Sequence, residues 1–245
     1  MVLRAEDVHV HYRIRMARVR VAQGWTPRRP RVVEVPRELH AVRGVSLQLR
    51  AGECLGIVGD NGAGKSSLLR ALGGFEPLAG GAVHVASAPR LLAIGGVTRP
   101  TWTGSETIEA GLRALRVPPE QRRDLTEDIV AFTELGDRLD APVSTYSRGM
   151  QGRLQFALNT AVPAQILCID EGLGGADGRH RAKAQERIAA MLAGAGAMVL
   201  VSHSLPLIER LATHAVWLHE GRVVLAGPPA DVIAGYEDHL KAPKP

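Results

Sequence analysis

The sequence predicts an α/β protein with a mainly parallel sheet, antiparallel strands near its N-terminus and an inserted α-helical subdomain. Two apolar runs, QILCID at 165–170 and AMVLVSH at 197–203, lack polar alternation, which is typical of central strands covered on both faces. Between them, RAKAQERIAAML at 181–192 has helical composition and spacing. A strand, a helix and a second strand in this order indicate a parallel sheet. We expect the 245 residues, 45% of them hydrophobic, to form one domain.

The N-terminal part of the chain favours strands followed by a helix. Residues 2–14 (VLRAEDVHVHYRI) alternate as an edge strand does, and residues 46–59 (SLQLRAGECLGIVG) contain two strands joined by a turn at Ala51-Gly52. Residues 66–74 (SSLLRALGG) predict a helix. We expect this helix to stop at Gly73-Gly74, because glycine commonly ends helices.

Helical patterns replace strands between about residues 98 and 160, the predicted subdomain. Thr103 and Glu106 fit a capping box at its first helix. Beyond the parallel strands, VWLHEGRVVLAG at 216–227 predicts a hairpin that turns at Glu220-Gly221. PADVIAGYEDHL at 229–240 predicts a terminal helix that begins with proline.

The net charge of +5 originates in one segment, the Arg-rich insert at 13–38. Within it, residues 13–37 carry a formal charge of +7, whereas the rest of the chain carries −2. A run of this kind is commonly a solvated loop. Its positive residues are Arg13, Arg15, Arg18, Arg20, Arg28, Arg29, Arg31 and Arg37.

The remaining composition excludes several classes of protein. The longest apolar runs are far shorter than the roughly 18–20 residues that cross a bilayer, and no signal peptide opens the chain, so we expect a cytosolic location. Cys54 and Cys168 lie in apolar runs and read as small core residues. We expect neither a disulfide nor a zinc site from them.

A glycine-rich phosphate loop follows the apolar strand CLGIV and precedes a helix. Residues 59–66 match G-x-x-x-x-G-K-[ST], a loop whose backbone N–H groups cradle phosphates at a helix N-terminus. We expect Lys65 to reach the β- and γ-phosphates of ATP and to act in catalysis, and Ser66 to bind Mg²⁺. The predicted ATP-binding residues of this loop are Gly59, Asp60, Asn61, Gly62, Ala63, Gly64, Lys65, Ser66 and Ser67.

Two carboxylates end the apolar strand at 165–170. Asp170 and Glu171 fall at the C-terminal edge of the predicted parallel sheet, where ligands of such sheets bind. Asp170 suits Mg²⁺, and Glu171 suits a general base that deprotonates the attacking water. Taken alone, the pair would more simply cap the next helix, but the phosphate loop favours the catalytic interpretation.

The segment STYSRGMQGRLQFAL at 144–158 resembles the signature of ABC-type ATPases, usually LSGGQ. The matching positions are Tyr146, Ser147, Arg148, Gly149 and Met150. The resemblance implies a P-loop NTPase core of the ABC ATPase kind. It also implies that Ser147 and Gly149 bind the γ-phosphate of an ATP held by the other subunit. Taken alone, the pentapeptide would be read as a serine cap on a helix.

Three further positions are similar to elements of the same family. His203, after the strand at 197–201, resembles the switch histidine that contacts the γ-phosphate and holds the general base. The D-loop position is occupied by Gly174, Gly175, Ala176 and Asp177. Tyr12 stands where an aromatic residue usually stacks on adenine, with His40 as an alternative, because the Arg-rich insert follows Tyr12.

Residues 91–108 (LLAIGGVTRPTWTGSETI) narrow the resemblance to one group within the family. They lack the glutamine that the family usually carries here, and they are similar to the LLELGAGF-HPELTGRENI pattern of exporters of polysaccharides, O-antigen and teichoic acids. The YS-x-GM-x-x-RL-x-F-A form of the signature and the long insert before the phosphate loop belong to the same group. Arg148, Gly172 after the glutamate and a D-loop without serine depart from the family pattern, so we expect slow hydrolysis.

The resemblance implies a subunit that binds ATP and Mg²⁺ and works as a homodimer with two ATP molecules at its interface. An ABC-2-type permease at the cytoplasmic face of the inner membrane would be its partner, and a lipid-linked glycan the exported substrate. The Arg-rich insert would then face anionic lipid head groups or the glycan's pyrophosphate. The alternatives are an exporter of lipid, drug or peptide, or a soluble ABC ATPase acting on nucleic acid or ribosomes. We expect no nucleic acid partner.

Overall fold

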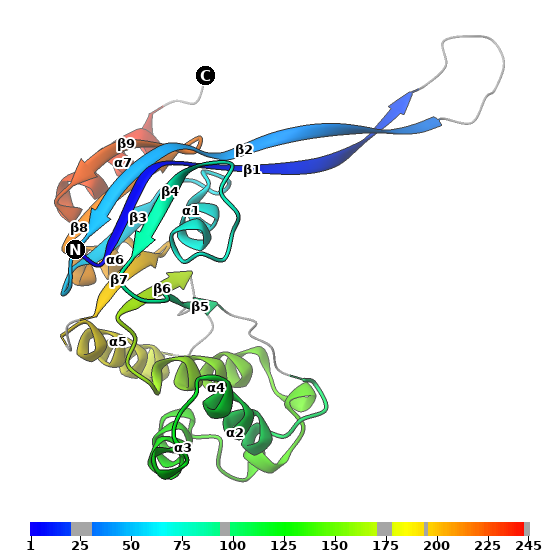
Figure 1. The fold of residues 1–245 in the computed structure, drawn as a ribbon, viewed down its shortest axis with the longest axis vertical. Helices are drawn as coiled ribbons and strands as arrows, with labels where there is room; N and C mark the ends of the chain where they lie inside the picture. Colours follow the sequence, from blue (N-terminus) through cyan, green and yellow to red (C-terminus); the bar gives the residue numbers. More distant parts are fainter. Residues whose placement is uncertain (21–30, 94–98, 171–177, 194–195, 243–245) are drawn as a thin grey trace.

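The computed structural model describes residues 1–20, 31–93, 99–170, 178–193 and 196–242. Two sheets lie together in one half of the molecule, and a group of helices forms the other half (Figure 1). Among the described helices, none is long and apolar enough to span a lipid bilayer.

The larger sheet has six strands in the order β5-β6-β7-β3-β8-β9. All neighbours in it are parallel except β8 and β9. Every residue of β3 and β7 is buried, which explains why these strands are continuous aliphatic runs. The predicted mainly parallel sheet is therefore confirmed. Its strands are β3 (Cys54–Val58), β5 (Arg90–Ala93), β6 (Ile166–Asp170), β7 (Ala197–Val201), β8 (His214–His219) and β9 (Arg222–Gly227).

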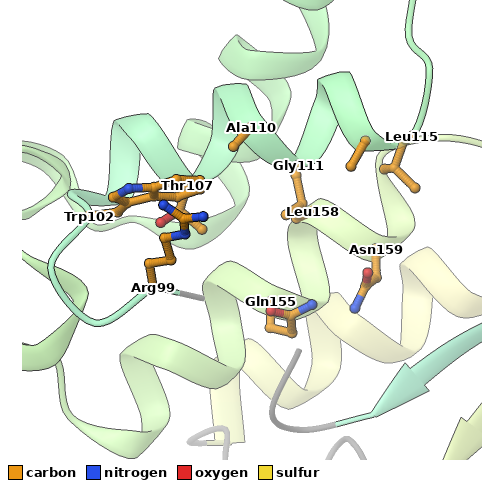
Figure 2. Close-up of a pocket in the computed structure, with 10 residues that line it drawn as sticks. Arg99, Trp102, Thr107, Ala110, Gly111, Leu115, Gln155, Leu158 and Asn159 are labelled. Carbon is orange, nitrogen blue, oxygen red and sulfur yellow. The ribbon is translucent and has the colours of Figure 1, made fainter. Parts of the chain in front are cut away.

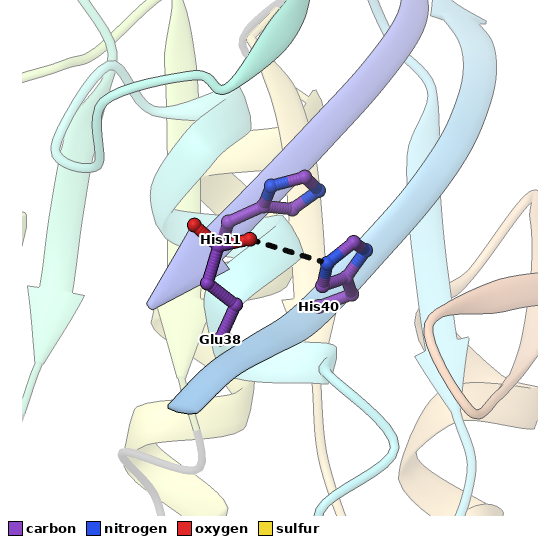
Figure 3. Close-up of side chains that lie close together, drawn as sticks. All are labelled: His11, Glu38 and His40. Atoms are coloured by element: carbon purple, nitrogen blue, oxygen red, sulfur yellow. Dashed lines mark ion pairs between the residues drawn. The ribbon is translucent and has the colours of Figure 1, made fainter. Parts of the chain in front are cut away.

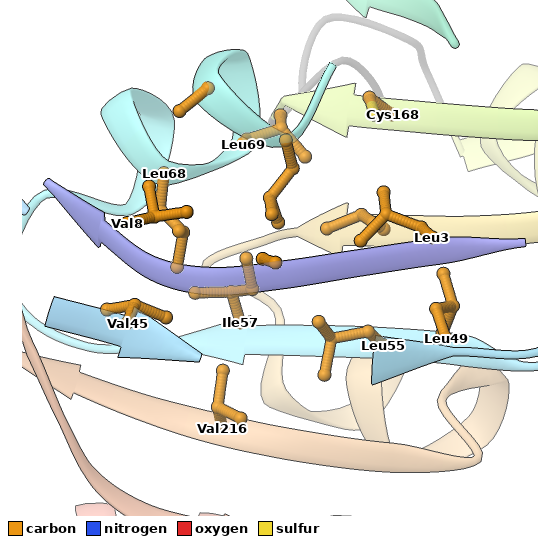
Figure 4. Packing of buried hydrophobic residues seen from close by; sticks show 14 of the residues in the cluster. Leu3, Val8, Val45, Leu49, Leu55, Ile57, Leu68, Leu69, Cys168 and Val216 are labelled. Carbon is orange, nitrogen blue, oxygen red and sulfur yellow. The ribbon is translucent and has the colours of Figure 1, made fainter. Parts of the chain in front are cut away.

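The smaller sheet is antiparallel and contains β1 (Leu3–Arg20), β2 (Arg31–Leu49) and β4 (Gly80–Val85) in the order β2-β1-β4. Its inner face packs against the larger sheet and against α1 (Lys65–Leu72), as Figure 4 shows. Fully burying one such aliphatic side chain contributes about 1.5–3 kcal/mol to folding. The main contributors are Leu3, Val8, Val45, Leu49, Leu55, Ile57, Leu68, Leu69 and Val216.

Residues 13–20 and 31–38 of the Arg-rich insert belong to β1 and β2 and project from the body of the molecule (Figure 1). The two strands stay paired from Arg13 opposite Glu38 out to Arg20 opposite Arg31. The interpretation of the insert as a loop is thus wrong for residues 13–20 and 31–38. The overlooked signal is the alternation of arginine with apolar residues over 13–16 and 18–20, which suits a strand. Arg28 and Arg29 lie outside the described residues.

The helical half contains three α-helices and two short 3₁₀ helices around a core of their own. Thr103 and Glu106 form the predicted capping box at the start of the first helix, with both reciprocal hydrogen bonds present. Ile108, Leu112 and Leu154 are among its most buried side chains. The elements are α2 (Gly104–Ala114), α3 (Pro119–Thr133), η1 (Gly136–Asp140), η2 (Val143–Thr145) and α4 (Arg148–Thr160).

The C-terminal part completes the larger sheet and covers its edge. Glu220 and Gly221 form the turn between β8 and β9 with positive φ angles of 45° and 79°, which confirms the predicted hairpin. The remaining helices are α5 (Gly178–Ala193), α6 (Leu205–Leu211) and α7 (Pro229–Lys241).

The two cysteines, Cys54 in β3 and Cys168 in β6, are buried in the core. Burial raises the pKa of both thiols to about 12, so both stay protonated at neutral pH.

Candidate nucleotide-binding site

The phosphate loop connects β3 to α1 and is held by close backbone packing. Gly59 and Gly64 have φ angles of 147° and 100°. A Cβ atom would lie 2.2 Å from the Leu218 carbonyl oxygen at Gly59 and 2.1 Å from the Ala41 carbonyl oxygen at Gly64. Only glycine combines this backbone conformation with so close an approach. The loop therefore follows a path that leaves the first N–H groups of α1 for an anion.

Lys65 lies inside this loop. Its Nζ donates hydrogen bonds to the carbonyl oxygens of Gly59, at 2.8 Å, and Asp60, at 3.0 Å. The side chain is only 6% exposed. The ammonium group is thus fixed beside the helix N-terminus, where both positive partial charge and a full positive charge favour phosphate.

Ser66 and Asp170 come together although 104 positions separate them. The Ser66 hydroxyl at the start of α1 donates a 3.0 Å hydrogen bond to Oδ1 of Asp170 at the end of β6. A hydroxyl and a carboxylate are the hard oxygen ligands that Mg²⁺ prefers, so the pair fits this ion. Glu171, the predicted general base, lies outside the described residues, as do Gly174, Gly175, Ala176 and Asp177.

A pocket of about 490 Å³ opens beside the loop. Tyr12 and His40, the two candidates for contact with adenine, both line it. The Tyr12 hydroxyl donates a 3.1 Å hydrogen bond to Ser67 Oγ. The His40 ring stacks on His11 with centroids 3.8 Å apart and lies near Glu38 (Figure 3). Both residues thus remain candidates, and Asn61, Gly62, Gly64, Lys65, Ser66 and Ser67 form the loop side of the pocket.

Four of the five signature positions lie at the beginning of α4. Ser147 is its N-cap, and the serine hydroxyl accepts a 3.2 Å hydrogen bond from the Met150 N–H. Ser147 and Arg148 are exposed, while Gly149 and Met150 are half-buried. The N–H groups of Arg148 and Gly149 precede the first intrahelical hydrogen bond, from the Gln151 N–H to the Ser147 carbonyl oxygen, whereas that of Met150 is occupied by the Ser147 side chain.

Tyr146, the first of the five signature positions, is buried instead of exposed. It is 6% exposed, and its hydroxyl donates a 2.6 Å hydrogen bond to the Arg138 carbonyl oxygen. Burial is the main cause that raises its pKa. Its side chain thus packs inside the helical core, while its place in the signature stays a prediction. Gly104 permits this packing, because a Cβ there would lie 2.3 Å from the Tyr146 hydroxyl.

His203 follows β7 at the edge where Asp170 ends β6. Asp170 lies opposite Val201 in the parallel register, and His203 lies two residues after Val201 in the chain. It is exposed. The placement is compatible with the predicted contact with a γ-phosphate, because Lys65, Ser66 and Asp170 lie at the same C-terminal edge of the parallel strands.

Sequence reasoning missed two supports of the phosphate loop. The turn between β8 and β9 holds it from one side, because the Gly221 N–H donates to the Ala63 carbonyl oxygen at 2.9 Å. From α7, the Tyr236 hydroxyl donates a 3.1 Å hydrogen bond to Asp60 Oδ1. No local signal identifies either contact, since 176 positions separate Asp60 from Tyr236.

Sequence comparison relates the chain to transport proteins. Residues 42–174 match the family described as ABC transporter. The teichoic acids export ATP-binding protein TagH of Levilactobacillus brevis is 35% identical over 201 residues, 82% of this chain and 56% of the relative. The O-antigen export system ATP-binding protein RfbB of Myxococcus xanthus is 36% identical over 201 residues, 82% of this chain and 46% of the relative. The chain spans about half the length of the curated relatives it matches.

Solved structures share the fold. The ATP-binding subunit of an ABC transporter superposes with a TM-score of 0.77 at 19% identity, over 97% of this chain and 94% of the other. A dimeric ATP-binding cassette in a post-hydrolysis state, with ADP and Pi, has a TM-score of 0.73 at 17% identity, over 93% of this chain and 98% of the other. This likeness confirms the predicted fold class. Together with the family match over more than half of the sequence, it leads to one conclusion: the chain belongs to the ABC transporter family.

Proposed function

We propose that the chain is the ATP-binding and ATP-hydrolysing subunit of an exporter of lipid-linked cell-surface polysaccharide. The observation that carries the ATPase part is the hydrogen-bonded pair of Ser66 and Asp170 beside the buried ammonium of Lys65. This arrangement would offer oxygen ligands to Mg²⁺ and a positive charge to the β- and γ-phosphates. Phosphoryl transfer by P-loop ATPases requires both. The names of the relatives TagH and RfbB support glycan as the cargo.

In this proposal the working unit is a head-to-tail homodimer with two ATP molecules between its subunits. The exposed first turn of α4 supports this arrangement, because Ser147 and the N–H groups behind it would complete a partner's phosphate site. ATP would favour closure, because it contacts both subunits only in the closed dimer. Hydrolysis and loss of phosphate would then reopen it.

Replacing Ser147 with alanine tests the shared site. We expect ATP hydrolysis to fall about 10–100-fold, the value of one hydrogen bond to a charged group, while ATP binding to the monomer is unchanged. Steady-state hydrolysis and equilibrium binding would measure the two effects. The matched control is Thr103→Ala, which also removes a helix N-cap in the helical half and costs a similar 0.5–2 kcal/mol, about the usual cap value. Equal losses of hydrolysis in both variants would contradict the role of Ser147.

A second pocket, between α2 and α4, is where we propose that the permease docks (Figure 2). It has a volume of about 410 Å³ and is lined mainly by apolar surface from Gly111, Leu115 and Leu158. At one end the Arg99 guanidinium lies 4.9 Å from the centre of the Trp102 ring. An apolar hollow with an aromatic residue and a cation at its rim suits an amphipathic helix end of a membrane protein. The chain would thus be peripheral, at the cytoplasmic face of the inner membrane.

Replacing Ala114 with tryptophan tests the docking pocket. Ala114 is exposed and lines the pocket, so the larger ring would fill it without disturbing the core. We expect the affinity for the permease to fall at least about tenfold, which corresponds to about 1.4 kcal/mol, with ATP hydrolysis by the isolated chain unchanged. The control is Ala131→Trp on α3, also exposed but away from the pocket. Unchanged binding of the permease to Ala114→Trp would exclude this surface.

The test of the whole proposal is what purifies with the chain from membranes. We expect a polytopic permease. We also expect deletion of the gene for this chain to stop the appearance of glycan at the cell surface. Recovery of nucleic acid instead, with a steep dependence on salt, would overturn the export function in favour of a nucleic-acid-directed ATPase.

A further inference from the structure

Three side chains with metal-binding atoms converge beside the phosphate loop. Asp60 belongs to the loop, His219 ends β8, and His239 lies near the end of α7. Their ligand atoms all lie within 4.8 Å of one another, and all three residues are half-buried. The cluster therefore joins three separate elements, two of which are far from the loop in sequence.

Neighbouring side chains hold the Asp60 carboxylate and the two histidine rings in place. Asp60 Oδ2 lies 3.7 Å from His239 Nε2, while Tyr236 donates its hydroxyl to the other carboxylate oxygen. The rings of His219 and His239 are 5.0 Å apart in an edge-on arrangement. Trp217 forms an apolar wall, with its ring centre 5.0 Å from that of His239. The hydrogen bond from Tyr236 orients the carboxylate as outer-shell partners do in metal sites.

We propose that Asp60, His219 and His239 form a site for a divalent transition metal ion, with Zn²⁺ as the preferred ion. Two imidazoles and one carboxylate are a ligand set typical of zinc sites that keep a fourth position for water. Ligand atoms about 2.0–2.2 Å from the ion in tetrahedral geometry lie about 3.3–3.6 Å apart, so small side-chain rotations close the present cluster. Imidazole ligands also disfavour Mg²⁺, which separates this site from the Ser66 and Asp170 pair.

A second cluster, His11, Glu38 and His40, supplies the comparison within the described parts of the chain (Figure 3). All three of its residues are exposed. Arg13 also lies 3.7 Å from Glu38, where its positive charge competes with a metal ion. The exposure of this second cluster and the competing charge of Arg13 both disfavour a bound cation there, so we assign the ion to the Asp60 cluster.

Metal bound to the Asp60 cluster would couple α7 to the nucleotide site. The Asp60 carbonyl oxygen accepts a hydrogen bond from Lys65, so an ion that restrains Asp60 also restrains the loop around Lys65. If metal alters the affinity for ATP, ATP must alter the affinity for metal by the same factor. The site thus gives the terminal helix a means to regulate the phosphate loop.

The experiment uses the untagged full chain, stripped of metal with a chelator and free of nucleotide. Titration with Zn²⁺ by calorimetry, and with Co²⁺ followed by its visible absorption, should give one tight equivalent with a tetrahedral spectrum. We expect His219→Gln and His239→Gln each to weaken this binding at least about tenfold, and His11→Gln to leave it intact. Because no nucleotide is present, the result does not depend on the proposed ATPase function.

Thermal unfolding in chelator identifies whether each variant is folded before titration. If one glutamine variant fails to fold, the other still decides the question. The proposal is overturned if the wild-type chain binds no stoichiometric Zn²⁺, if a folded His219 or His239 variant binds it as the wild type does, or if His11→Gln abolishes it.

Discussion

The Lys65→Ala variant is expected to lose ATP hydrolysis by at least about 100-fold, the loss typical of removing one preorganised charge-stabilising donor. The Lys65 ammonium is buried and positioned by the carbonyl oxygens of Gly59 and Asp60. Alanine removes this ammonium and with it the positive charge that we expect to stabilise the transition state. Affinity for ATP should fall as well, because the β- and γ-phosphates lose a charge-assisted partner. Steady-state hydrolysis and equilibrium binding of a fluorescent ATP analogue would measure both.

Lys241→Ala is the control for this variant. Lys241 is an exposed lysine on α7 that lies 3.5 Å from Asp238, and surface pairs of this kind contribute little to stability. We expect its hydrolysis to equal that of the wild type. If Lys65→Ala hydrolyses ATP normally, the phosphate loop is not the catalytic nucleotide site.

The Glu171→Gln variant should stop turnover without preventing ATP-dependent dimerisation. Glutamine keeps the size of the side chain but cannot take a proton from water, and loss of a general base lowers rates by about 10²–10⁴-fold. ATP would therefore accumulate in the closed dimer. Hydrolysis assays together with size-exclusion chromatography in ATP and Mg²⁺ would separate the two effects.

Glu186→Gln, an exposed position on α5, is the matched control for charge and side-chain size. It should retain both hydrolysis and reversible dimerisation. Retained turnover in Glu171→Gln would refute the assignment of the base, whereas loss of dimerisation in ATP would refute the shared site.

Elements with strong local patterns could be predicted from the sequence. The hairpin that turns at Glu220-Gly221 and the capping box of Thr103 and Glu106 depend on neighbouring residues, and both occur where expected. The central strands were equally clear, because burial on both faces leaves only apolar residues in them. The Arg-rich insert was harder, since its charge favoured a loop while its alternation suits the observed strands.

The functional residues divide in the same way. Motif spacing was enough to place Lys65 at the start of a helix, because loop and helix are adjacent in the chain. Tyr146 was assigned from its position in a motif, and the structure buries it against Arg138. A motif indicates which residues stand together in sequence, but not which of them face outward.

The sequence by itself determined the phosphate loop, the alternation of strands and helices, and the family to which they belong, because each of these is written in residues close together along the chain. Only the tertiary structure decided which distant side chains meet. Ser66 contacts Asp170 because β6 lies in the order β5-β6-β7-β3, one strand removed from the strand that leads into α1. Asp60 meets Tyr236, His219 and His239 because α7 packs back over β8. Such contacts depend on strand order and helix packing, which local periodicity does not encode.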